Sequence, residues 1–229
     1  MAKLSVILPT YNERENLPEV IAQIRRLPID VECVIVDDDS PDGTGEVADR
    51  LASKDPLIKV IHRPRKAGLA SAVHAGLSKA SAPYVAVMDA DLQHPPYLLT
   101  QMLRALEDGY DLVVASRYVR GGGVVGWPLL RRIVSRVATL LAHLTIPRSR
   151  VVKDPMSGYF ALKREVLESV RVYSPIGYKL LLTILAKGRY SKIKEVPLVF
   201  RRRLRGKSKL DQREVLTYLK LLLNLLRQR

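Results

Sequence analysis

The sequence predicts an α/β fold in which a mostly parallel sheet is covered by helices on both faces. Two observations predict it. Short, continuous apolar runs recur along the first half of the chain, and amphipathic segments with helical spacing separate them. Strands that are buried on both faces read as such runs, and strands that alternate with helices form parallel sheets. The 229 residues are 47% apolar, which is enough for one large domain with a full core.

Five strands and four helices are expected within the first 118 residues. The expected strands are residues 4–8, 31–36, 58–62, 84–88 and 112–116, and the expected helices are residues 16–27, 41–53, 69–80 and 96–108. Ser40 and Pro41 have the character of a helix N-cap and a first helical residue, so the second helix should begin there.

The alternation stops after residue 118, and two amphipathic helices are expected later, at residues 129–146 and 211–228. The second of them carries Leu219, Leu222 and Leu226 at helical spacing, flanked by basic residues. Both helices could pack on the core in the ordinary way. They could instead lie in a membrane interface, with their apolar faces in lipid. The sequence leaves these two alternatives open.

The net charge of +15 favours an anionic partner, such as nucleic acid, a membrane surface or a phosphorylated substrate. A nucleic-acid-binding module would need stacking aromatic residues. Only 6% of the residues are aromatic, and the basic run at residues 201–209 contains none. We therefore expect no nucleic acid partner. The single cysteine, Cys33, excludes an internal disulfide, and no apolar stretch approaches the ~18 residues of a membrane span.

Three polar segments follow predicted strands, at residues 9–13, 37–39 and 89–93. Ligands of parallel sheets bind at the carboxyl ends of the strands, so these segments should meet at one edge. The first segment lacks the Gly-x-Gly-x-x-Gly fingerprint of a dinucleotide site. The glycines at residues 121–123 are not followed by the Lys-Ser/Thr of a P-loop, and they form either a flexible lid or a plain surface loop.

Two carboxylates, Asp89 and Asp91, follow the fourth predicted strand, and the amide of Gln93 comes next. Acids at the end of a buried strand are costly unless a cation binds them. The usual occupant is a hard divalent ion that holds a diphosphate. One acid could instead cap the next helix, but a cap explains neither the second acid nor Gln93. We therefore predict a metal–diphosphate site here.

Four segments together resemble glycosyltransferase family 2. They are residues 6–13 (VILPTYNE), 36–40 (VDDDS), 89–96 (DADLQHPP) and 116–118 (SRY). Four further segments narrow the resemblance to the dolichol-phosphate mannose synthases of that family. They are Trp127-Pro128 with Arg131, residues 154–158 (DPMSG), residues 175–179 (PIGYK) and residues 205–209 (RGKSK). The order and spacing of these segments, over roughly residues 3–212, make the resemblance specific.

The resemblance implies a Rossmann-like GT-A fold in a catalytic domain over residues 1–210, followed by a C-terminal amphipathic helix over residues 211–229. It implies inverting, metal-dependent transfer of mannose from GDP-mannose to dolichyl (polyprenyl) phosphate. A glucosyltransferase that uses UDP-glucose on the same lipid would share these motifs. The expected place is the cytoplasmic face of a membrane, as a peripheral protein without a transmembrane helix. Either the amphipathic helices or a membrane-anchoring subunit would hold it there.

The resemblance also implies roles for individual residues. Nucleotide-sugar binding falls to Pro9, Tyr11, Glu13, Val36, Asp38, Asp89, Ala90, Asp91, Gln93, Arg117, Lys179, Arg203 and Lys209. Mg²⁺ or Mn²⁺ would bind Asp89, Asp91 and Gln93, and the catalytic residues would be Asp91, Arg117 and Arg131.

Elementary chemistry agrees with these roles. A phosphate monoester, with a second pKa near ~6, is already an anionic nucleophile at neutral pH. Such an acceptor needs cationic positioning rather than a strong general base. The histidines fit this expectation: we take His62 and His74 as structural because neither has an acidic partner nearby in the sequence, and His94 is set beside the metal motif.

Overall fold

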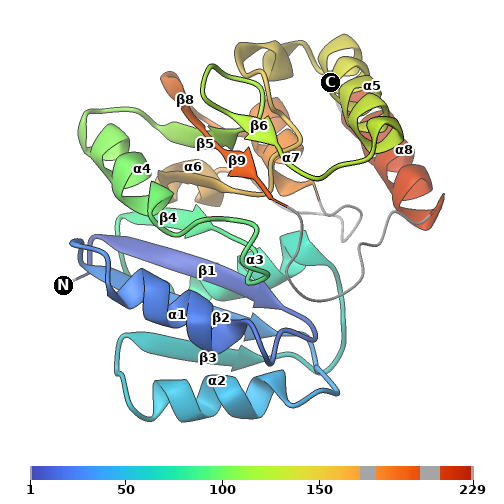
Figure 1. Ribbon diagram of the computed structural model, residues 1–229. Helices are drawn as coiled ribbons and strands as arrows, with labels where there is room; N and C mark the ends of the chain where they lie inside the picture. Colours follow the sequence, from blue (N-terminus) through green and yellow to red (C-terminus); the bar gives the residue numbers. More distant parts are fainter. Residues whose placement is uncertain (1, 171–178, 202–211, 228–229) are drawn as a thin grey trace.

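The computed structural model describes residues 2–170, 179–201 and 212–227, and its centre is a seven-stranded sheet (Figure 1). Its strands are β1 (Leu4–Thr10), β2 (Val31–Asp37), β3 (Ile58–His62), β4 (Tyr84–Val87), β5 (Leu112–Ser116), β7 (Phe160–Lys163) and β8 (Ile193–Pro197). Their order across the sheet is β3-β2-β1-β4-β7-β5-β8. All neighbours are parallel except β7, which runs antiparallel to β4 and β5. The predicted α/β class with a mostly parallel sheet is confirmed.

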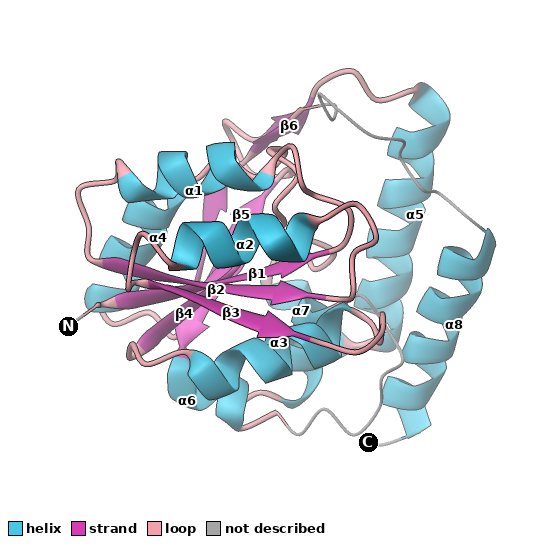
Figure 2. Cartoon of the chain, turned by 90° about the horizontal axis from the view of Figure 1, so that it is seen from below, coloured by secondary structure: helices cyan, strands magenta, loops and turns pink. Residues whose placement is uncertain are grey.

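Helices cover both faces of this sheet (Figure 2). They are α1 (Leu17–Arg25), α2 (Thr44–Ala52), α3 (Leu69–Lys79), α4 (Leu98–Glu107), α6 (Arg164–Glu168) and α7 (Leu180–Lys187). The helices α1, α2 and α4 share one apolar cluster with the sheet, and α3, α6 and α7 share another on the opposite face. Two apolar layers therefore enclose the strands, as the continuous apolar runs predict.

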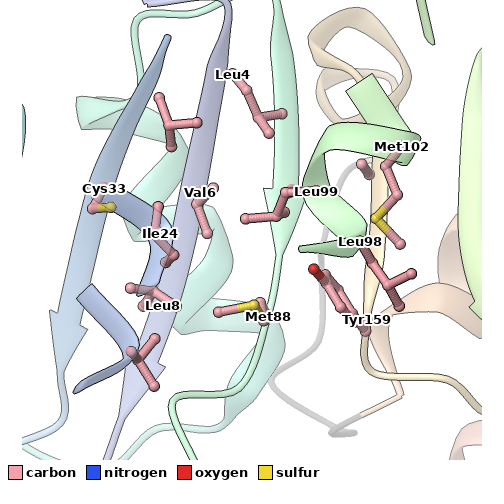
Figure 3. Close-up of a cluster of buried hydrophobic side chains, with 14 of the residues drawn as sticks. Leu4, Val6, Leu8, Ile24, Cys33, Met88, Leu98, Leu99, Met102 and Tyr159 are labelled. Carbon is pink, nitrogen blue, oxygen red and sulfur yellow. The ribbon is translucent and has the colours of Figure 1, made fainter. Parts of the chain in front are cut away.

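Alternate residues of β1 enter opposite layers. Leu4, Val6 and Leu8 pack toward α1 and α4 (Figure 3). Ile7 packs toward α3 on the opposite face. Cys33 of β2 belongs to the first layer and is fully buried. Burial raises the pKa of its thiol to about 12, so this cysteine is an unreactive core residue.

The second helix begins later than predicted, at Thr44 rather than at Pro41. Asp42 causes the shift, because its Oδ1 accepts hydrogen bonds from both the backbone N–H and the hydroxyl of Thr44. Gly43 precedes the helix with a φ of +85°, a conformation that glycine adopts without strain. Ser40 does not cap the helix; its hydroxyl donates to Asp37 instead.

Several elements after residue 118 were not expected from the sequence, among them α6, α7 and β8. Two further features of this region lie close to the polar edge of the sheet. The first is β7, which follows residues 154–158 and inserts between β4 and β5. The second is a two-stranded parallel sheet of β6 (Gly123–Val124) and β9 (Val199–Phe200). Residues 196–200 have a strand-like sequence, but their pairing with β6 was not expected. The glycine segment at 121–123 is thus neither a free lid nor a plain loop, since its last residue enters a strand. A Cβ atom at Gly122 would clash with the carbonyl oxygen of Ser116, so the close approach requires glycine there.

The two amphipathic helices pair with each other at one side of the molecule (Figures 1 and 2). They are α5 (Leu129–Thr145), followed by a short 3₁₀ helix at Pro147–Val151, and α8 (Gln212–Arg227). Their contact buries Tyr218, Leu222 and Leu225, and the Tyr218 hydroxyl donates to the Ala138 carbonyl of α5. Leu222 is therefore packed between the helices, whereas Leu219 is exposed.

A broad apolar face of this helix pair stays in contact with solvent. Its residues on α5 are Leu129, Leu130, Ile133, Val134, Val137, Leu140 and Leu144, and those on α8 are Leu216, Leu219 and Leu223. The exposed fractions of these ten residues range from 38% to 73%. Within the described ranges, no helix has the length and apolar character needed to cross a membrane.

A buried carboxylate supports the amino ends of the strands. Glu32 of β2 pairs with Lys59 at 2.7 Å and accepts hydrogen bonds from Ser5 and Ser81. Burial alone would raise the pKa of Glu32, but the Lys59 ammonium and these hydrogen bonds outweigh it. They lower the pKa from 4.5 to about 2.

We expect this pair to make the fold acid-sensitive. The pKa of Glu32 is lower in the folded protein than in the unfolded chain. The pair therefore stabilises the fold fully above pH 4.5 and loses this effect as the pH falls toward 2. The full contribution to the free energy of unfolding is about 3 kcal/mol. Glu32→Gln should lower the free energy of unfolding at pH 7 and flatten its decline below pH 4.5. Urea unfolding at several pH values measures both effects. The exposed Glu46→Gln is the control, and equal acid slopes for Glu32→Gln and wild type would contradict the assignment.

Candidate active site

The three predicted polar segments lie at one edge of the sheet, beyond the carboxyl ends of β1, β2 and β4. The parallel register places Thr10 beside Asp37, and the Thr10 hydroxyl donates to the Asp37 carboxylate at 3.1 Å. Each segment holds one residue other than glycine with a left-handed backbone: Asn12, Asp39 and Leu92, with φ of 62°, 56° and 62°. Such conformations cost free energy and cluster at functional sites. This edge is therefore the candidate site.

An ion pair closes the side of the site near β2 and β3. Oδ1 of Asp38 lies 2.7 Å from Nε of Arg63. Oδ2 of Asp38 accepts a hydrogen bond from Nη2 of Arg63 at 3.0 Å. Both side chains are largely buried, and Arg63 Nη1 also donates to Ser71 on α3. Sequence reasoning missed Arg63, although its place directly after β3, at the same sheet edge, was a usable signal. Asp38 is thereby held as an oriented, acceptor-only carboxylate.

The segment after β1 contributes an aromatic face and a carboxylate. The Lys66 ammonium lies 4.1 Å from the centroid of the Tyr11 ring, a cation–π contact. Glu13 accepts a hydrogen bond from the Asn16 side chain at 2.7 Å. The structure thus brings Tyr11 and Glu13 to the same edge as Asp38. Pro9 is half-buried inside β1, whereas Val36 is fully buried in β2.

The acidic motif has one buried and one accessible carboxylate. The side chain of Asp89 is 42% exposed, whereas Asp91 is 4% exposed and its Oδ1 accepts the backbone N–H of Gln93. The side-chain amide of Gln93 donates to the carbonyl of Arg201 at 2.6 Å, which fixes the end of β9. Ala90 is buried between the two acids.

His94 orients this motif through the backbone. Its Nδ1 accepts the backbone N–H of Asp89 at 3.0 Å, so a neutral ring carries its proton on Nε2. The ring stacks on Tyr159, with centroids 5.0 Å apart, and meets Phe200 edge-on at 5.6 Å. Elsewhere, His62 does have an acidic partner, Asp49 at 2.9 Å, which is thirteen residues away in sequence.

The donor set of this motif suits a hard divalent ion. In the part of the chain that the structure describes, no three His, Cys, Asp or Glu side chains are grouped to hold a metal. Mg²⁺ and similar ions do not need such a cage, because one or two carboxylates, water and substrate phosphates complete their shell. Asp89 and Asp91 supply that number of carboxylates. A side chain at Gly158 would come within 3.6 Å of Oδ2 of Asp89, so glycine leaves space there.

Two arginines and a tryptophan form the other half of the site. Arg117 donates through Nε and Nη2 to Asp154, both at 2.7 Å, and Asp154 is fully buried. Burial would lower the pKa of the Arg117 guanidinium, but its hydrogen bonds to Asp154 outweigh this and raise it. Trp127 contacts both arginines, and the guanidinium carbons of Arg117 and Arg131 lie 5.5 Å and 4.1 Å from its ring centroid.

The remaining predicted residues are placed only in part. The side chain of Lys179 reaches the 154–158 segment, and its ammonium donates to the carbonyl oxygen of Met156 at 3.4 Å. Arg203 and Lys209 lie outside the described residues. Asp154 and Trp127 were noted in the sequence only as parts of motifs, and the geometry now shows what each of them contacts.

Comparison with known proteins identifies the family. Residues 5–171 match the family model described as Glycosyl transferase family 2. The chain belongs to this family. The family 2 resemblance drawn from the motifs is thus confirmed, and so is the expectation that the protein is a glycosyltransferase.

Two curated relatives of this glycosyltransferase have names that agree with the narrower resemblance. The dolichol-phosphate mannosyltransferase of Pyrococcus furiosus is 48% identical over 220 residues, which cover 95% of this chain and 62% of the relative. The polyprenol monophosphomannose synthase of Mycolicibacterium smegmatis is 39% identical over 214 residues, which cover 90% of this chain and 80% of the relative. The chain therefore spans less than two thirds of the first relative.

Solved structures of similar fold support the GT-A-like architecture. A glucosyl-3-phosphoglycerate synthase from Mycobacterium tuberculosis, in complex with Mn²⁺, UDP and glucosyl-3-phosphoglycerate, matches with a TM-score of 0.74 at 24% identity, covering 99% of this chain and 80% of that one. A mannosyltransferase from Pyrobaculum calidifontis, in complex with GDP-Man and Mn²⁺, matches with a TM-score of 0.66 at 20% identity, covering 97% and 64%. At these identities the likeness concerns the fold alone.

The acidic motif generates a direct test. Asp91→Asn removes one charge from a nearly buried carboxylate while keeping its shape and its acceptor for the Gln93 N–H. We expect sugar transfer to fall by at least ~100-fold, in the range reported for lost electrostatic groups in active sites, with little change in melting temperature. Mn²⁺ should raise the melting temperature of the wild type with GDP more than that of the variant. Undiminished wild-type activity in EDTA would contradict the metal assignment.

Proposed function

We propose that this glycosyltransferase transfers mannose from GDP-mannose to a polyprenyl phosphate such as dolichyl phosphate, with inversion at the anomeric carbon. One observation carries the proposal: an acidic motif suited to a metal–diphosphate and an arginine pair suited to a phosphate meet at Phe200. The ring of Phe200 lies 5.6 Å from those of His94 and Trp127, and 5.8 Å from the Arg117 guanidinium carbon. A donor diphosphate and an acceptor phosphate can thus come together. The names of both curated relatives support this reading.

The donor half binds and orients the nucleotide sugar. Tyr11 would line the nucleotide pocket, and Val36 with Asp38, which Arg63 fixes, would close around the base and ribose. Asp89, Asp91 and the side-chain oxygen of Gln93 would hold Mg²⁺ or Mn²⁺. The ion, when bound, stabilises the negative charge of the leaving diphosphate. In this proposal Pro9, Glu13, Val36, Ala90, Gln93, Lys179, Arg203 and Lys209 complete the donor site.

The acceptor half needs no general base. The phosphate monoester is already anionic at neutral pH, so Arg117 and Arg131 bind it and hold one oxygen in line with the anomeric carbon. Trp127 and Phe200 shield this place from water, which limits hydrolysis of the donor. Inversion follows when that oxygen attacks the face of the sugar opposite to the leaving diphosphate.

A donor and acceptor screen tests the proposal. Purified protein with Mn²⁺ is incubated with GDP-mannose, UDP-glucose or UDP-N-acetylglucosamine, with and without a polyprenyl phosphate. We expect a glycolipid product from GDP-mannose alone, and only with the lipid phosphate. Faster transfer from UDP-glucose would replace the mannose assignment by the glucosyltransferase alternative, and no product from any donor would contradict the proposed function.

The lipid acceptor places the enzyme at a membrane surface. We propose that the exposed apolar face of α5 and α8 lies in the lipid interface of the cytoplasmic leaflet, so that a membrane-anchoring subunit is not essential. The net charge of +15 adds attraction to anionic lipids, worth about 1 kcal/mol for each basic residue near the surface.

Liposome binding checks this arrangement. Vesicles with anionic lipid should bind the protein, and 0.5 M salt should weaken the binding without abolishing it, because salt does not screen the apolar contribution. Replacing the exposed Ile133 and Leu140 by Ser should release the protein at an unchanged melting temperature. Leu57→Ser, at an exposed leucine in the turn before β3, is the matched control, and Leu222→Ser should instead lower the melting temperature. Equal binding by the double variant would refute the proposal.

A further inference from the structure

Asp154 holds Arg117 by three hydrogen bonds. Its Oδ2 accepts from the backbone N–H of Arg117 at 3.0 Å and from Nε at 2.7 Å, and its Oδ1 accepts from Nη2 at 2.7 Å. One carboxylate therefore fixes the backbone and one edge of the guanidinium together. The side chain of Arg117 is 10% exposed, so few other orientations are open to it.

Glu195 of β8 in turn holds Asp154. Its Oε2 accepts the backbone N–H of Lys153 at 2.9 Å, and its Oε1 accepts that of Asp154 at 3.2 Å. Glu195 pairs in register with Val114 of β5, the strand that ends just before Arg117. The Asp154 loop is also attached to β5 through Ser157, whose hydroxyl donates to the Ala115 carbonyl at 2.7 Å. The loop is thus fixed to the strand that carries Arg117.

The pairing decides which edge of Arg117 can meet a ligand. A guanidinium has five N–H donors in one plane, and Asp154 occupies the edge formed by Nε and Nη2. Aromatic rings of Tyr118, Trp127 and Phe200 surround the group, at 5.4 to 5.8 Å from its central carbon. Asp154 does not occupy the edge at Nη1, which can bind a phosphate oxygen. The Asp154 hydrogen bonds and the rings keep the guanidinium in this orientation.

We propose that Asp154, held by Glu195, is a positioning residue that presents the Nη1 edge of Arg117 to the acceptor phosphate. The inference rests on the proposed function, because it gives Arg117 a phosphate to bind. It adds roles for two residues that lie outside the proposed binding site.

A double-mutant cycle tests the proposal in the full chain. The variants are Asp154→Asn, Arg117→Gln, the combination of both, and Glu195→Gln, with Glu168→Gln at an exposed ion pair as the control. GDP affinity with Mn²⁺ is measured by calorimetry. Transfer is measured over a range of polyprenyl phosphate concentrations at saturating donor.

We expect Asp154→Asn to lower kcat/KM for the polyprenyl phosphate by ~100-fold, the scale on which a misplaced group reduces rate. Its GDP affinity should stay within about twofold of the wild type, since the Asp154 contacts lie on the acceptor side. The same change in the Arg117→Gln background should cost no more than about twofold, because Asp154 would act only through Arg117. Glu195→Gln keeps one acceptor oxygen and should lower kcat/KM several-fold.

Several results would overturn the proposal. Asp154→Asn could reduce transfer equally in both backgrounds, or it could weaken GDP binding as much as transfer. If Asp154→Asn does not fold, Glu195→Gln decides, and acceptor kinetics equal to those of Glu168→Gln refute the inference. Absence of transfer by the wild type with every donor would instead be a failure of the proposed function. The two failures are therefore distinguishable.

Discussion

Parallel pairing of β1 with β2 and β4 is the constraint on which the candidate site depends. It brings the carboxyl ends of three strands to one edge, so that segments far apart in the sequence share a small volume. The pairing also fixes which side chains face the ligand, because a slip of one residue would turn every side chain to the other face. The hydrogen bond from Thr10 to Asp37 locks that register where the strands end. The left-handed residues Asn12, Asp39 and Leu92 then turn each segment across the edge.

Buried ion pairs provide the second level of order at this edge. Asp38 with Arg63, and Asp154 with Arg117, both place a carboxylate in a largely dehydrated environment. Pairs of this kind add little net stability compared with well-packed apolar residues. Their value lies in orientation, since two nitrogens of each guanidinium meet one carboxylate, which fixes the arginine and makes the acid an oriented acceptor. In the proposed function both pairs flank the bound charged substrate, where fixed charges lower the cost of reorganisation.

The sequence was a sufficient guide wherever the signal is local. The apolar runs predicted five strands of the sheet, and the acids after β4 marked the edge at which the site lies. It was insufficient where a partner comes from far along the chain. Arg63, Asp154 and Glu195 acquire their roles from contacts across 25, 37 and 41 residues, which no periodicity encodes. The insertion of β7 is of the same kind, because its apolar residues fit a helix or a strand until β4 and β5 flank it.

The C-terminal helix shows how a correct pattern can leave its meaning open. Its leucines follow the helical period, but the period does not say which neighbour they meet. Leu222 turns toward α5 and Leu219 toward solvent, so one apolar stripe is divided between packing and exposure. The division follows from the pairing of α5 with α8, since each helix can bury only one side in the other. An apolar surface of ten residues is then left beside a strongly cationic protein. Exposure on this scale is unfavourable in water. In the proposed arrangement a lipid surface would cover these residues and relieve that cost.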